Sequence, residues 1–218
     1  PEPMNEQEFD QLFEEISNRK LDITWDASNG IIGSAAVIHE ELVHAASESG
    51  CIGMYFGIES GNDQILRKVK KPSSVKHFRK LGKLMEKYPN IFTRGFLMMG
   101  FPNETLGQIH DTIKLSREMN LDWYTVQLLT PLPSTAIYNE MVEAGAIEDG
   151  SLNIDGEGFT MFSVRESERQ RRKERQQKTN AREFYNVFKN DLDTVPTKPE
   201  LTELWLLVDY EINYKRLL

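Results

Sequence analysis

Cysteine is nearly absent from this sequence, which contains one, Cys51, in 218 residues. One thiol can neither close an intramolecular disulfide nor supply the several thiolates of a cysteine-rich metal site. A reducing compartment fits such a chain, and we expect the cytoplasm. Long apolar runs are also lacking, since no stretch approaches the roughly 20 apolar residues of a membrane-spanning helix. The sequence shows no basic start followed by an apolar run, so it does not indicate secretion.

Basic residues are fewer than acidic ones: the chain has 26 Lys and Arg and 34 Asp and Glu, which gives a net charge of −8. This balance argues against nonspecific nucleic-acid binding by the whole surface. The exception is the segment 165–182, with eight Lys and Arg and three Glu. It lacks the interleaved aromatic residues that stack on bases, so we interpret it as a solvated helix face. Hydrophobic residues make up 39% of the chain, which is enough for a folded core.

Apolar, strand-like segments alternate with amphipathic helical patterns through the first two thirds of the chain. Such alternation predicts a parallel sheet covered by helices, here an incomplete (β/α) barrel of about four strands. We expect this α/β unit over 1–150 and a helical carboxy-terminal appendage over 151–218. The expected strands are 21–25, 51–58, 91–99 and 124–129, and the expected helices are 5–19, 39–49, 63–70, 74–88, one opening at Thr105, 134–144 and 200–216.

Polar residues follow each expected strand. Because the carboxyl ends of parallel strands share one edge of a sheet, where ligands bind, we expect these residues to gather there. The set comprises Asp26, Asn29, Glu59, Ser60, Asn62, Asn103, Glu104 and Thr130.

Three of these strand ends resemble a known family. Gly57-Ile-Glu-Ser-Gly61, the run from Gly95 to Thr105 (GFLMMGFPNET) and Thr130-Pro-Leu-Pro-Ser-Thr135 resemble, in order, the fourth to sixth strands of radical S-adenosylmethionine (radical SAM) barrels. The resemblance covers roughly residues 5–150 and favours the subgroup often preceded by a cobalamin-binding domain. Asn103 and Ser134 stand where the family usually has glycine; Asn tolerates left-handed turns, and Ser can cap a helix.

The resemblance implies S-adenosylmethionine and a [4Fe–4S] cluster as cofactors, with cobalamin used in the subgroup. In the intact family, reduction cleaves S-adenosylmethionine to a 5′-deoxyadenosyl radical. By resemblance, Glu59 would accept hydrogen bonds from the ribose hydroxyls, and the segment from Phe96 to Gly100 would flank the adenine. The expected cofactor-binding residues are Glu59, Ser60, Phe96, Met98, Gly100, Leu129 and Thr130, and the expected substrate-facing residues are Asp26, Asn29 and Glu104.

The family's C-x-x-x-C-x-x-C loop has no counterpart in this sequence. We therefore expect a fragment that starts inside the barrel, lacks the cluster ligands and is inactive alone. Its partners would be the missing amino-terminal part and a small-molecule substrate. Such an open barrel would expose a strand edge near Ile23 and Trp25, which favours dimerisation. No catalytic residue and no metal ligand is assigned, and none of the four histidines is interpreted as a ligand.

Two other functions stay open. The chain could be a non-catalytic binding or scaffold subunit that completes a barrel with another chain. It could also be an ordinary barrel lyase or aldolase, which ranks last because no expected strand contains a Schiff-base lysine. Individual residues have simpler interpretations too: Glu59 as a helix cap, Phe96 to Met99 as core, Asp26 and Asn29 as turn residues, and Cys51 as a small buried hydrophobe.

Overall fold

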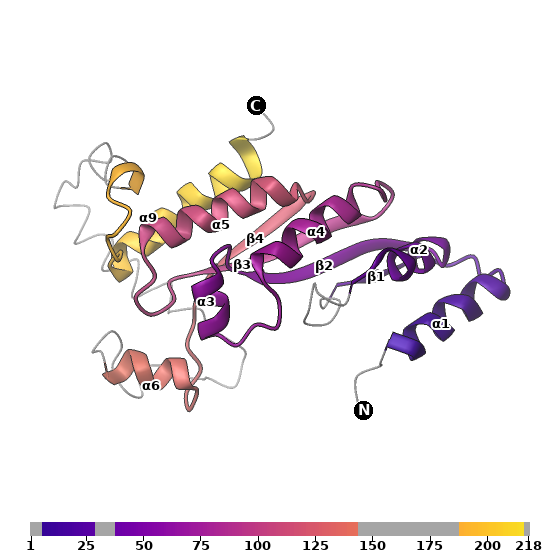
Figure 1. The fold of residues 1–218 in the computed structure, drawn as a ribbon, viewed down its shortest axis with the longest axis horizontal. Helices are drawn as coiled ribbons and strands as arrows, with labels where there is room; N and C mark the ends of the chain where they lie inside the picture. The colour runs from indigo at the N-terminus through magenta and orange to yellow at the C-terminus, as the bar shows by residue number, and fades with distance from the viewer. Residues whose placement is uncertain (1–5, 29–37, 144–187, 216–218) are drawn as a thin grey trace.

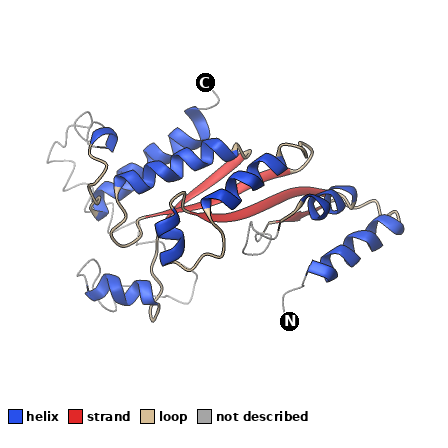
Figure 2. Cartoon of the chain, viewed as in Figure 1, coloured by secondary structure: helices blue, strands red, loops and turns tan. Residues whose placement is uncertain are grey.

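The computed structural model describes residues 6–28, 38–143 and 188–215. Its centre is a parallel sheet of four strands in the order β1-β2-β3-β4 (Figure 2). This confirms the predicted α/β class and the number of strands. The strands are β1 Trp25–Ala27, β2 Cys51–Glu59, β3 Phe92–Met99 and β4 Trp123–Leu128.

Helices follow each strand, as the sequence pattern predicts. The Thr105 cap is confirmed in detail: the Gln108 amide donates to the Thr105 hydroxyl at 3.3 Å, and the Thr105 amide donates to the Gln108 side chain at 3.0 Å. The helices are α1 Glu6–Asn18, α2 Glu40–Glu48, α3 Asp63–Lys68, α4 Val75–Met85, α5 Leu106–Met119, α6 Ala136–Glu143 and α9 Lys198–Asp209, which continues as the π-helix η1 Tyr210–Tyr214.

The first strand differs from its prediction. It begins at Trp25 rather than Leu21, and it includes Asp26, which was expected in a loop. The Trp25 amide donates to the Gly50 carbonyl at 3.1 Å, and its indole donates to the Ser49 carbonyl, also at 3.1 Å. These bonds start the pairing with β2 at Trp25, whereas Leu21 is 48% exposed.

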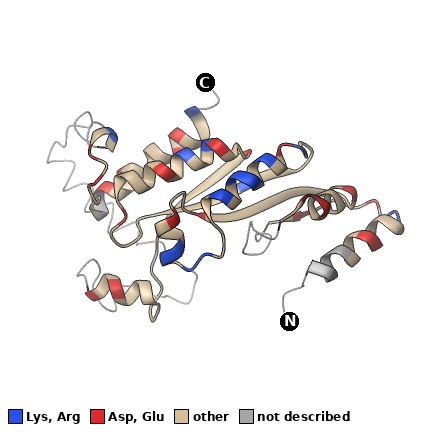
Figure 3. Ribbon diagram, viewed as in Figure 1, with Lys and Arg blue, Asp and Glu red and all other residues tan. Residues whose placement is uncertain are grey.

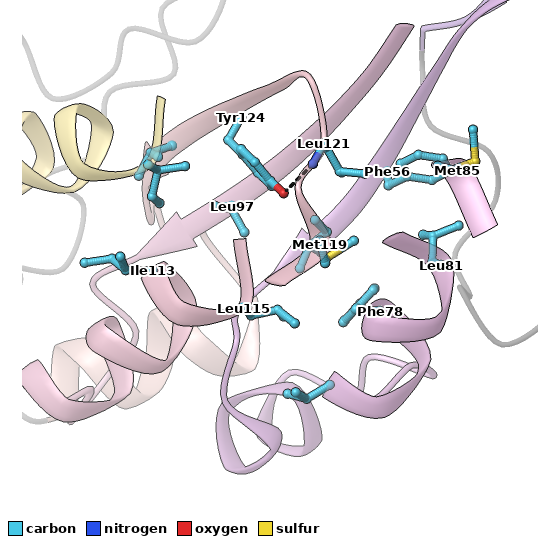
Figure 4. Packing of buried hydrophobic residues seen from close by; sticks show 14 of the residues in the cluster. Phe56, Phe78, Leu81, Met85, Leu97, Ile113, Leu115, Met119, Leu121 and Tyr124 are labelled. Atoms are coloured by element: carbon cyan, nitrogen blue, oxygen red, sulfur yellow. Dashed lines mark hydrogen bonds between the residues drawn. The ribbon is translucent and has the colours of Figure 1, made fainter. Parts of the chain in front are cut away.

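The main core lies between the sheet and the helices α4 and α5, which both cross the same face (Figure 1). Tyr124 is central to this core: its hydroxyl donates to the Ser116 carbonyl at 2.6 Å and accepts from the Leu121 amide at 3.0 Å (Figure 4). The two helices pack closely at Gly82, where an added Cβ would lie 2.6 Å from the Met119 backbone. A larger residue would therefore force α4 and α5 apart.

The carboxy-terminal residues from Phe188 onward pack back on the sheet, with α9 beside β4 and η1 against α5 and β4 (Figure 1). The Leu106 and Gly107 amides at the start of α5 donate to the carbonyls of Thr194 and Leu192, at 2.9 and 2.8 Å. This segment therefore satisfies donors that a helix start leaves unpaired. The predicted domain boundary at 150 and the basic segment 165–182 lie outside the described residues.

Charge is concentrated on the helices, with basic residues on α3 and α4 and acidic residues on α1 and α2 (Figure 3). Within the described ranges, no helix is both long and apolar enough to cross a membrane.

Candidate functional site

The face of the sheet opposite α4 and α5 is the surface on which most of the predicted cofactor-binding residues converge. Alternate residues of a strand point to opposite faces, and one set is packed in the core with α4 and α5. The other set is only partly covered by the described residues. We call this surface the inner face; it comprises Tyr55, Gly57, Phe92, Arg94, Phe96, Met98, Trp123, Thr125 and Gln127.

Glu59 ends β2 at the carboxyl edge of the inner face. Its backbone is left-handed, with φ of 68°, a conformation that side chains other than glycine rarely adopt. Its carboxylate forms an ion pair with Lys71, with Oε1 at 3.1 Å from Nζ. Both side chains lie over Gly57, because a Cβ added there would be 3.2 Å from Glu59 Oε1 and 3.0 Å from Lys71 Nζ. Gly57 pairs with Phe96 in register, so Glu59 lies beside a predicted adenine-contacting residue.

The interpretation of Glu59 as the cap of the next helix is wrong. Asn62 caps α3 instead, since its side-chain oxygen accepts from the amides of Gln64 and Ile65, at 3.0 and 3.3 Å. The Glu59 carboxylate is therefore not used by a helix terminus.

Ser60 does not lie on the inner face with the other predicted cofactor-binding residues. Its side chain is fully buried against α5, with its hydroxyl 3.3 Å from the Thr112 hydroxyl. Gly61 fixes this approach, because its amide donates to the same Thr112 hydroxyl at 2.8 Å. The predicted cofactor contact of Ser60 stays a prediction, and the side chain as placed does not serve it.

The ends of β3 and β4 bring together the remaining predicted cofactor residues. Phe96 and Met98 are partly exposed on the inner face, and Gly100 follows with a φ of 90°. The Leu129 amide donates to the Met99 carbonyl at 2.8 Å, which extends the pairing of the two strands beyond β4. Thr130 continues this edge and is partly exposed. Glu59, Phe96, Met98, Gly100, Leu129 and Thr130 therefore share one edge of the sheet.

Glu104 is buried, with 1% of its surface exposed. Its Oε2 accepts hydrogen bonds from the amides of Gly100 at 2.6 Å and Phe101 at 3.2 Å, while its Oε1 is buried with no partner among the described residues. Burial raises the pKa of this carboxyl from 4.5 to about 7, against the opposing effect of the two amides. The side chain thus holds the turn after β3, and its predicted substrate-facing role stays a prediction.

The other two predicted substrate-facing residues lie at β1. Asp26 is exposed and pairs in register with Gly53, whereas Asn29 lies outside the described residues. Their roles remain predictions.

An iron–sulfur cluster does not fit the described residues. Cys51 is buried at the start of β2, and burial raises the pKa of its thiol. The described ranges contain no group of three or more His, Cys, Asp or Glu side chains that could hold a metal ion. No step through a cluster is therefore assigned to residues of this chain.

Three inner-face contacts were missed by sequence reasoning: those of Lys71, Tyr55 and Arg94. Arg94 lies against the rings of both Tyr55 and Phe96, with its Cζ 5.8 and 5.7 Å from their centroids. The signal in the sequence was one cationic residue inside an apolar strand. The strand pattern could not say whether that residue faced a helix, solvent or a ligand.

Comparisons with known proteins agree with the predicted family and fold. The family model of the radical SAM superfamily matches residues 1–116, more than half of the chain. The chain is 30% identical over 123 residues to an uncharacterised methyltransferase of Pyrococcus horikoshii, covering 56% of this chain and 26% of that one. It is 27% identical over 134 residues to the bacteriochlorophyllide d C-12(1)-methyltransferase of Chlorobaculum tepidum, covering 61% of this chain and 28% of the relative.

Among solved structures, the fold resembles the radical S-adenosylmethionine methyltransferase TsrM of Kitasatospora setae, a structure with cobalamin and a [4Fe–4S] cluster bound. The TM-score is 0.51 at 18% identity, and the match covers 63% of this chain and 28% of the other. The chain thus spans little more than a quarter of the length of these relatives. The match of the family model over more than half of its residues shows that this chain belongs to the radical SAM superfamily.

Proposed function

We propose that this chain binds the adenosine part of S-adenosylmethionine at the carboxyl edge of its sheet, as the carboxy-terminal part of a radical SAM enzyme. The observation that carries the proposal is the Glu59 carboxylate, held at the end of β2 over Gly57 and beside Phe96. The [4Fe–4S] ligands would come from residues outside this chain, because it has one cysteine and that cysteine is buried.

The free oxygen of Glu59 suits a ribose. Lys71 occupies Oε1, whereas Oε2 accepts no hydrogen bond from the residues that the structure describes. A carboxylate can accept several hydrogen bonds, so Glu59 can accept from a sugar hydroxyl while it keeps its ion pair. The Glu59 side chain is 23% exposed, so a ligand can reach the carboxylate from solvent. The rest of the side chain is covered by protein, which strengthens a charge-assisted hydrogen bond to the carboxylate.

The surroundings suit an adenine ring. Phe96 and Met98 offer apolar surface, and Gly100 allows a planar ring to approach the backbone closely. Backbone groups of Leu129 and Thr130 lie at the same edge, where they would meet the polar rim of the base. Bound beside a reduced [4Fe–4S] cluster that residues outside this chain would hold, S-adenosylmethionine would supply radical chemistry that can act on unactivated C–H bonds.

For the whole protein, we propose a methyl-transfer reaction. Two of the relatives are named as methyltransferases, which favours transfer of a methyl group to a small-molecule substrate. The TsrM structure has cobalamin bound, which favours cobalamin as a further cofactor. The alternative is a non-catalytic subunit that completes a barrel without binding the cofactor.

Calorimetric titration of the chain with adenosine and with 2′,3′-dideoxyadenosine tests the proposal. We expect adenosine to bind about tenfold more tightly, because only adenosine has hydroxyls for Glu59. In Glu59→Gln the two nucleosides should bind almost equally. Glu118→Gln is the matched control, since Glu118 pairs with Arg79 on the helix side of the sheet.

Three results would count against this function. Equal binding of both nucleosides to the unaltered chain would remove the ribose contact. A preference that persists in Glu59→Gln would move it to another residue. No nucleoside binding at all would favour the non-catalytic subunit.

A further inference from the structure

A second site lies on the inner face, further from the carboxyl edge, around Arg94. The strand register places Arg94 between Tyr55 on β2 and Trp123 on β4. Two residues further along β3, on the same face, Phe96 lies beside Thr125 of β4. All of these side chains belong to the inner face. Arg94 is the one cationic residue within the described strands.

The guanidinium of Arg94 is held from three sides. Its Cζ lies 5.8 Å from the centroid of the Tyr55 ring and 5.7 Å from that of Phe96, within the range of cation–π attraction. Its Nε donates to the Thr125 hydroxyl at 2.8 Å. The two rings also contact each other edge to face, with centroids 6.3 Å apart. The group is therefore fixed before any ligand arrives, which lowers the entropic cost of binding.

No carboxylate neutralises this guanidinium within the described part of the chain. Its Nε bond to Thr125 is its one hydrogen bond there, so both terminal nitrogens lack a partner. Of the nearby acids, Glu59 is paired with Lys71, and Asp122 accepts from the amide and hydroxyl of Thr93, both at 2.7 Å. Asp26 lies on β1, two strands away. A partly buried cation without a counter-ion is costly for stability unless something else compensates it.

We propose that Arg94 binds the carboxylate or phosphate group of the substrate. A guanidinium presents two parallel N–H groups that match two oxygens of either anion. Phe92, 45% exposed, and the partly exposed Trp123 flank this position, so the ligand would carry an apolar body next to its acid. Met98 lies four positions after Arg94 along β3, or about 13 Å at the usual rise of a strand. The acid would therefore lie roughly that far from the nucleoside edge.

The identification of the Arg94 ligand as a substrate rests on the proposed function, because the proposed cofactor site lies on the same face of the sheet. The anion site itself needs neither cofactor nor cluster. The two ideas can therefore fail separately.

The test uses three naphthalene probes with the full 218-residue chain: 2-naphthoate, 2-naphthyl phosphate and the neutral 2-naphthamide. Isothermal titration calorimetry should show at least one anion binding about tenfold more tightly than the amide. In Arg94→Met the preference should disappear. Arg79→Met is the matched control and should keep it, because Arg79 pairs with Glu118 on the helix side. The anion that binds more tightly identifies the source as carboxylate or phosphate.

A conservative variant keeps the proposal testable if Arg94→Met misfolds. If Arg94→Met fails to fold, judged by circular dichroism, Arg94→Lys carries the test: it keeps the charge but loses the planar fork, so the preference should fall about threefold or more. Equal binding of anions and amide, an unchanged preference in Arg94→Met or Arg94→Lys, or an equal loss in Arg79→Met would overturn the proposal. Adenosine binding that fails while the anion preference persists would reject the cofactor site alone.

Discussion

The side chain of Asn213 forms both hydrogen bonds that a neighbouring strand would form with Tyr124. Its Oδ1 accepts from the Tyr124 amide at 2.9 Å, and its Nδ2 donates to the Tyr124 carbonyl at 2.8 Å. The Trp205 indole continues this pattern by donating to the Val126 carbonyl at 2.6 Å. The helix α9 and η1 thus close the outer edge of β4, which would otherwise offer unpaired backbone groups to other chains.

Asn213→Leu should destabilise the fold by about 2–4 kcal/mol, because it removes both bonds and leaves a buried amide and carbonyl unpaired. Asn213 is fully buried, so water cannot replace the lost bonds without local opening. Urea unfolding monitored by circular dichroism measures the change. Asn90→Leu is the control, since Asn90 is exposed and its side-chain amide donates to the Ser47 hydroxyl. A loss no larger than that of the control would contradict the edge-closing role.

The opposite edge of the sheet is open in the described residues, because β1 pairs only with β2. Ile23, just before β1, is 45% exposed. We expect a concentration-dependent dimer through this edge, which the charged variant Ile23→Lys should weaken about tenfold or more. Sedimentation velocity gives the dissociation constant. Leu206→Lys, on α9 and 61% exposed, should leave it unchanged; a clean monomer for the unaltered chain at high concentration would argue against this interface.

Glu104 should make stability depend on pH. Its pKa is about 7 in the folded chain and near 4.5 when unfolded, so folding favours its protonated form. Its contribution is fully present below about pH 4.5 and is lost as pH rises through 7, a change of about 3 kcal/mol. The free energy of unfolding of the unaltered chain should therefore fall relative to Glu104→Gln between pH 5 and about pH 8.

Urea titrations of both chains across this pH range measure that difference. Glu86→Gln is the matched control because the Glu86 side chain is exposed at the end of α4. A constant difference between the unaltered chain and Glu104→Gln at every pH would show that Glu104 does not titrate in this range.

Ser134 and Asn103 keep the backbone shape of the glycines that they replace in the family pattern. Their φ angles are 67° and 60°, in the left-handed region that glycine adopts without a Cβ penalty. Ser134→Gly should therefore stabilise the chain by about 1 kcal/mol, more than Asn103→Gly, because asparagine tolerates this region better. Thermal unfolding of both variants makes the comparison; destabilisation by Ser134→Gly would mean that its side chain contributes more than its backbone strain costs.

Much of this fold follows from local sequence. The spacing of apolar residues predicted the strands and helices, and the Thr105 and Gln108 pair predicted where α5 begins, because caps and periodicity depend on neighbouring residues. The order of three strand-end motifs also predicted the family, and it placed Glu59, Phe96 and Gly100 at one edge of the sheet.

The tertiary structure decided what those residues face. Ser60 and Glu104 follow strands in the same way as Glu59, yet one packs against Thr112 and the other folds back on the Gly100 amide. Strand alternation shows which residues share a face, but it does not show which face the helices cover. The exposure of Arg94 and the closing of β4 by Asn213, 89 residues beyond Tyr124, therefore depend on packing between distant segments and not on local sequence.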